Sequence, residues 1–143
     1  MQKLKKLLAM VIAGVMVVAM TTIAASAQSV EPMQSISARA VPVRGISPLS
    51  DYSATTTLTS SSSSGYATST ASKNAYMVKA KCDVNNNGQS VLTSGWTTQN
   101  NTSKATSGTV KATTKVCTYT AYGESQETAT SVLYGSEISK SYS

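Results

Sequence analysis

Apolar side chains occupy every even-numbered position of residues 76–84, with polar ones between them from Lys79 onward, and this alternation limits the kind of fold that the chain can build. Lysines and an aspartate fill one parity, Lys79, Lys81 and Asp83. Successive side chains on a strand point to opposite faces of a sheet, so the pattern predicts a strand with one buried face. The residues expected on that buried face are Tyr76, Val78, Ala80, Cys82 and Val84.

The rest of the chain after residue 50 also favours strands over helices. Of the 93 residues in 51–143, 36 are Ser or Thr and only ten are Leu, Ile, Val or Phe. Ser and Thr lower helix propensity, and further strands are expected near 54–60, 66–72 and 129–134, and around Leu92 to Trp96 and Val110 to Ala112. We therefore predict an all-β domain over 51–143, a small antiparallel β-sandwich of about six to seven short strands.

The N-terminal 27 residues have the composition of a secretory signal peptide. Lys3, Lys5 and Lys6 precede a charge-free apolar run, and Ala25-Ser26-Ala27 supplies the small residues of a cleavage site. The sequence predicts a signal helix over 1–27, a mature chain that begins at Gln28, and a secreted protein of bacterial type. An uncleaved membrane anchor is the alternative, because the apolar run can be extended toward the length that spans a bilayer.

All three prolines of the chain lie between residues 28 and 50, together with Arg39 and Arg44. This composition predicts an extended, disordered Pro-containing linker over 28–50. A propeptide cut near one of the two arginines is the alternative.

The charge of the mature chain is too small to identify a partner. Removal of residues 1–27 takes three of the 12 basic residues and leaves nine against six acidic ones, a net charge near +3. Such a weak excess indicates neither nucleic acid nor a membrane surface as the partner of the mature form. We expect an extracellular or cell-wall partner of unknown identity, and no cofactor.

Cys82 and Cys117 are the only cysteines, and an even count in a small exported protein predicts a disulfide between them. Closing a loop of about 36 residues would contribute roughly 3 to 4 kcal/mol. The parity of Cys117 disagrees with that of Val110 and Ala112, so a β-bulge between Thr113 and Val116 is expected to turn it inward.

The segment that follows Cys82 has two interpretations. Asn87-Gly88 is typical of a type I′ turn, which predicts a hairpin between Val84 and Val91. The alternative is the first half of a calcium loop, although Ser94 stands where that loop needs a glutamate. Its metal ligands would be Asp83, Asn85 and Asn87.

Catalysis is not expected. The chain contains no histidine, and no lysine has a serine three residues before it, so neither the usual general base nor an S-x-x-K nucleophile is present. Binding is the remaining function class, because aromatic side chains can form an exposed platform for polysaccharide. The platform residues would be Trp96, Tyr119 and Tyr122; the competing interpretation, which we favour, places the aromatic residues in a core that has few aliphatic ones.

The stretch Ser72–Thr98 combines the predicted strand, the turn at 85–88 and Gly95-Trp96. In these features it resembles the middle of the lactococcin-type β-sandwich bacteriocins of Gram-positive bacteria, and the composition resembles small Ser/Thr-rich secreted proteins of that group. The resemblance implies an exported antagonist of other cells. From the residues themselves we predict a secreted, non-enzymatic β-domain that acts by contact at the cell exterior, with a cell-wall polysaccharide-binding module as a further alternative.

Overall fold

Nine antiparallel strands make up the part of the chain that the computed structural model describes, residues 31–43 and 51–143. The all-β prediction is confirmed, whereas the expected signal helix lies outside the described residues. Within those residues there is no helix long and apolar enough to cross a membrane. The strands are β1 (Gln34–Arg39), β2 (Val41–Pro42), β3 (Ala54–Ser60), β4 (Ser64–Asn86), β5 (Ser90–Thr93), β6 (Thr97–Thr106), β7 (Val110–Lys111), β8 (Cys117–Gln126) and β9 (Leu133–Tyr142).

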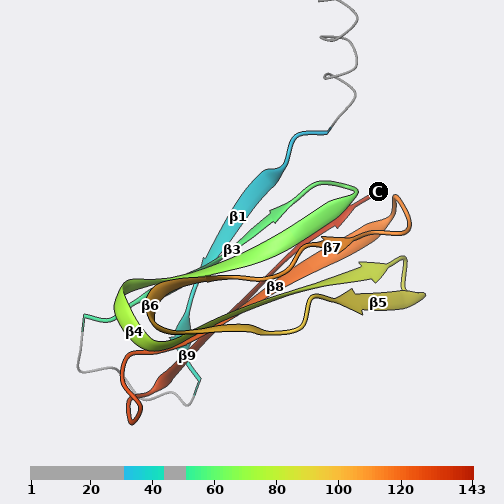
Figure 1. The fold of residues 1–143 in the computed structure, drawn as a ribbon. Coiled ribbons are helices and arrows are strands. Elements are labelled where there is room, and N and C mark those ends of the chain that lie inside the picture. The colour runs from blue at the N-terminus through green and yellow to red at the C-terminus, as the bar shows by residue number, and fades with distance from the viewer. Residues whose placement is uncertain (1–30, 44–50) are drawn as a thin grey trace, which may run out of the picture. The chain divides into compact units, whose positions relative to one another are not determined.

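Within the described residues the strands form one nearly closed, barrel-like sheet of nine strands, rather than the predicted sandwich of about six to seven short strands. Its order is β1-β3-β4-β8-β9-β2, and β5, β6 and β7 pair with β4 outside this path (Figure 1). Only Ala40 separates β1 from β2 along the chain, so the first and last strands of the order belong to one continuous segment. This segment pairs with β3 through β1 and with β9 through β2, which brings the two ends of the sheet together.

β4 is the longest strand and changes its buried parity near its middle. Its first half pairs with β3 and its second half with β8. Odd-numbered residues are buried from Gly65 to Ala71 and even-numbered ones from Val78 onward, and the register against β6 shifts between Thr70 and Ala75. The predicted alternation is therefore correct from Val78 to Val84. Tyr76 lies within the irregular stretch and is exposed, contrary to the prediction.

The core is built largely from small side chains. Besides Leu58, Val78, Val84 and Tyr119, its fully buried positions are mostly alanines, serines and threonines. Gly65 is required beneath Tyr119, because a Cβ at Gly65 would lie 2.7 Å from a carbon of the tyrosine ring. A thin core of this kind allows strands on opposite sides of the barrel to approach closely.

The structure corrects the boundary predicted at residue 51. Residues 34–42 lie within the predicted linker, yet they form β1 and β2 and belong to the sheet. Pro42 is tolerated because β2 is only two residues long and ends there. The other part of the predicted linker, 28–30 and 44–50, lies outside the described residues.

The predicted disulfide is absent: Cys82 and Cys117 are both buried, and no bond joins their sulfur atoms. The register explains why. Cys82 lies opposite Ala121, and Cys117 lies opposite Asn86, so the cysteines are four residues apart along the β4-β8 ladder. That offset is about 13 Å at the rise of a strand, whereas a disulfide needs Cα atoms within about 7 Å.

The predicted turn at Asn87-Gly88 is confirmed, whereas the bulge predicted before Cys117 is not found. Asn87 and Gly88 both have positive φ angles, 51° and 73°, and the Gln89 amide donates to the Asn86 carbonyl at 3.0 Å, as a type I′ turn requires. Cys117, Tyr119 and Ala121 do face inward. The parity changes in a connection at 112–116 between β7 and β8 rather than through the expected bulge.

Candidate functional site

One outer face of the sheet carries charged and aromatic side chains from β4, β8 and β9. Lys79 lies opposite Glu124, Lys81 lies opposite Tyr122, and Tyr122 in turn lies opposite Glu137. Residues directly opposite on neighbouring strands have Cβ atoms about 4.5–5.5 Å apart, so these side chains contact one another across the sheet.

Trp96 is brought over this face by a short connection between β5 and β6. The Ser94 amide donates to the Cys82 carbonyl at 2.8 Å, and the Cys82 amide donates to Ser94 Oγ at 3.0 Å. Gly95 then adopts a φ of 69°, a conformation that glycine takes without steric cost. The chain turns at this glycine, and Trp96 follows directly.

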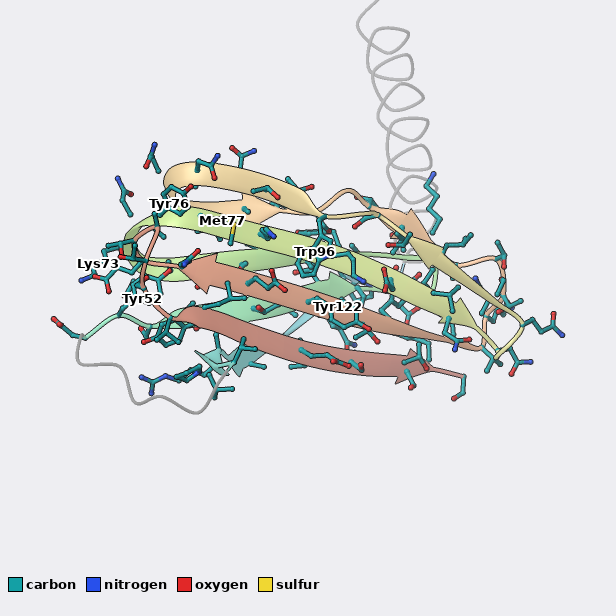
Figure 2. All side chains as sticks on the ribbon, turned by 90° about the horizontal axis from the view of Figure 1, so that it is seen from below. Tyr52, Lys73, Tyr76, Met77, Trp96 and Tyr122 are labelled. Atoms are coloured by element: carbon teal, nitrogen blue, oxygen red, sulfur yellow. The ribbon has the colours of Figure 1, made fainter. Side chains whose placement is uncertain are left out.

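Trp96 rests on two lysine side chains and a tyrosine. Lys81 Nζ is 5.5 Å from the centre of the Trp96 ring and 4.3 Å from that of Tyr122, while Lys79 Nζ is 5.9 Å from the Trp96 ring. The Trp96 and Tyr122 rings are 6.5 Å apart and inclined at 60°. These cation–π contacts hold Trp96 in place although 44 % of it is exposed. Figure 2 shows Trp96 and Tyr122 in the middle region of the sheet and Tyr76 near one end.

A hollow of about 370 Å³ opens beside the two aromatic rings. Its walls come from residues 41–43, from Trp96, Tyr122 and Glu124, and from residues 135–137. Gly135 lies between Glu124 on β8 and Val41 on β2, and the Val43 side chain lies over it, since a Cβ at Gly135 would be 3.2 Å from Val43 Cγ2. The hollow is shallow and open to solvent, so a ligand in it would lie along the surface of the sheet.

The lysines of the face are paired with carboxylates. Lys79 Nζ is 3.5 Å from Glu124 Oε2, and Lys81 Nζ is 3.1 Å from Asp83 Oδ2. Burial, followed by the negative charges of Glu137 and Asp83, raises the pKa of Tyr122. Tyr122 is therefore a neutral hydroxyl near neutral pH, and it can both donate and accept a hydrogen bond.

The structure brings together two of the three platform residues named from the sequence. Trp96 and Tyr122 share the outer face, whereas Tyr119 lies on the opposite face of β8 and is fully buried. Tyr119 therefore belongs to the core and cannot take part in a surface platform. Trp96 does not fit the favoured interpretation that the aromatic residues form the core, because it lies on the surface.

Sequence reasoning missed the charged members of this face. Lys79 and Lys81 were visible as the exposed parity of a strand, but nothing in the sequence aligned them with β8. Glu137 lies on a strand predicted to end at Tyr134, whereas β9 extends to Tyr142. The one available signal was the outward parity that Glu124 shares with Tyr122.

The residues of the calcium alternative have other contacts. Asp83 is paired with Lys81, and Asn85 Oδ1 accepts a hydrogen bond of 2.8 Å from the Gly88 amide. Asn87 is the first central residue of the hairpin turn. Over residues 31–43 and 51–143, no three His, Cys, Asp or Glu side chains are grouped so that they could hold a metal ion.

Comparisons of the chain with models of protein families, with curated proteins and with solved structures find no match. The resemblance of Ser72–Thr98 to the lactococcin-type bacteriocins therefore stays a prediction. We call the outer surface formed by Trp96 and its neighbours Lys79, Lys81, Tyr122, Glu124 and Glu137 the Trp96 face.

Proposed function

We propose that the chain is an exported, non-enzymatic binding protein whose Trp96 face holds glycan chains at the cell exterior. The single observation that carries the proposal is the exposed Trp96 ring beside Tyr122 at the edge of a hollow. Export is supported by the charged, apolar and small-residue segments of residues 1–27.

The chemistry of the face is suited to a sugar ring. The faces of a pyranose ring carry C–H groups that can pack on an aromatic ring, and its hydroxyls need hydrogen-bond partners around the edge. Trp96 offers the aromatic surface, while Tyr122, Glu124 and Glu137 offer polar atoms at the same hollow. An apolar surface with a few polar groups is the usual composition of a small-ligand site.

The Trp96 face is also fixed before any ligand arrives. The Ser94 hydrogen bonds, the positive φ of Gly95 and the lysine contacts all limit where the Trp96 ring can lie. A side chain that is already ordered loses less conformational entropy on binding, so more of the contact energy remains as affinity.

Retention on insoluble polysaccharides, including bacterial cell-wall glycan and chitin, tests the proposal. We expect the protein to be retained on at least one of them and Trp96→Ala to weaken retention about tenfold or more, as expected for loss of a tryptophan anchor. Tyr76→Ala is the matched control, because Tyr76 is 47 % exposed against 44 % for Trp96 but lies near one end of the sheet (Figure 2). Equal retention of the protein and Trp96→Ala would overturn the proposal.

A further inference from the structure

Charged side chains surround Trp96, and most of them form ion pairs with one another. Two lysines and three carboxylates surround the Trp96 and Tyr122 rings. Lys79 pairs with Glu124, and Lys81 pairs with Asp83. Among the described residues Glu137 forms no ion pair, so its carboxylate is the one on this face that is not matched by a lysine.

Glu137 is placed where a ligand in the hollow would contact it. It lies directly opposite Tyr122 on the neighbouring strand, it lines the hollow, and its side chain is exposed. The negative charge of Glu137 helps to raise the pKa of Tyr122. A carboxylate that has no ion-pair partner in residues 31–43 and 51–143, beside two aromatic rings, has the components of a site for an organic cation.

We propose that the glycan held by the Trp96 face carries a free, protonated amino group, as in a de-N-acetylated amino sugar, and that Glu137 binds this group. The inference rests on the proposed glycan-binding function. The ammonium donates a charge-assisted hydrogen bond to the Glu137 carboxylate, and such bonds are about twice as strong as neutral ones. The same cation lies within reach of the Tyr122 and Trp96 rings, which attract positive charge.

The lysines of the face do not oppose this ligand. Each of them is already neutralised by a carboxylate at 3.1 or 3.5 Å, and each points at an aromatic ring. An acetylated amino sugar carries no charge, so it would leave Glu137 without compensation. The face is therefore expected to discriminate between the two forms of the same sugar.

Calorimetric titration of the purified protein with two oligosaccharides of equal length tests the inference. One is a glucosamine oligomer and the other its N-acetylated counterpart. We expect the glucosamine oligomer to bind about tenfold or more tightly, and the preference to shrink as salt is added. Glu137→Gln keeps the shape of the side chain and should abolish the preference, whereas Glu127→Gln, whose carboxylate pairs with Lys73 elsewhere, should keep it.

The outcomes separate the two proposals. Equal affinity for both oligomers, with loss of both in Trp96→Ala, would overturn the role of Glu137 and leave glycan binding intact. Binding of the glucosamine oligomer that neither Glu137→Gln nor Trp96→Ala weakens would overturn the inference, because the cation would then be bound elsewhere. Binding of neither oligomer, nor of any polysaccharide in the retention assay, would overturn the proposed function itself.

Discussion

At the scale of single residues, the buried hydroxyls differ in how well they are satisfied. The Tyr142 hydroxyl donates to the Ser60 carbonyl at 2.8 Å and lies 3.0 Å from Ser60 Oγ. The Tyr134 hydroxyl is buried and has no hydrogen-bond partner among the described residues. Burying a polar group without a partner is unfavourable, whereas a satisfied one contributes roughly 0.5–1.5 kcal/mol.

Removing these two hydroxyls should therefore have opposite effects on stability. We expect Tyr142→Phe to lower the free energy of unfolding by about 1 kcal/mol and Tyr134→Phe to leave it unchanged or raise it. The midpoints of urea unfolding of the two variants and the parent chain measure the difference. Both substitutions remove one oxygen from a tyrosine, so each is the control for the other; a loss of 1 kcal/mol in Tyr134→Phe would contradict the assignment.

At the scale of elements, two Ser-Gly connections have the same construction. Ser94 exchanges hydrogen bonds with both backbone groups of Cys82, and Ser107 does the same with Ala67. Each serine Oγ also donates at 2.8 Å to the carbonyl of the glycine that follows it. The motif Thr-Ser-Gly occurs at 93–95 and again at 106–108, but only the first copy precedes a tryptophan.

Ser94→Ala and Ser107→Ala should both be destabilising, the buried Ser107 at least as much as Ser94, but they should differ in function. Each leaves a strand amide without its serine acceptor, at a cost of about 1–3 kcal/mol. Only Ser94→Ala loosens the connection that places Trp96, so only this variant should also weaken glycan retention. Thermal unfolding and the retention assay, run on both variants well below their unfolding temperatures, check this. Equal retention of the two variants would mean that Ser94 does not position Trp96.

Strands along which apolar and polar residues alternate without a break could be predicted from the sequence, whereas segments in which this alternation is broken could not. Ala54–Ser60 is a strand with the predicted ends, and Asn87-Gly88 forms the predicted turn. Residues 34–42 were missed because the three prolines and two arginines of the surrounding segment 28–50 indicate a linker, although β3 and β9 supply the partners that make them strands. Trp96 was assigned to the wrong environment because the sequence has few aliphatic residues for a core, whereas the structure fills its core largely with alanines, serines and threonines.

At the scale of the whole molecule, the absence of a disulfide makes the barrel depend on its packed interior. Among the ionisable side chains of that interior, the Cys82 thiol and the Tyr119 phenol are both fully buried. Burial raises the pKa of Cys82 from 9.0 to about 12. Burial, followed by the nearby Cys117, raises the pKa of Tyr119 from 10.0 to about 12. Both groups are acids that the fold keeps neutral.

The free energy of unfolding should therefore decrease at alkaline pH. Below about pH 9 both groups are protonated in the folded and unfolded chains, so their full contribution to stability is present. Above that pH the unfolded chain ionises first, and the free energy of unfolding should fall until about pH 12, where the folded groups ionise as well. The chain has no histidine, so no such change is expected between about pH 6 and 8.

Urea unfolding followed by circular dichroism at a series of pH values measures this dependence. In Cys82→Ala the decline should be shallower, because the Cys82 thiol no longer contributes to it. Lys111→Ala, an exposed strand position, is the control and should leave the decline unchanged. A decline that begins near pH 6 in the parent chain would show that another group controls the stability of the barrel.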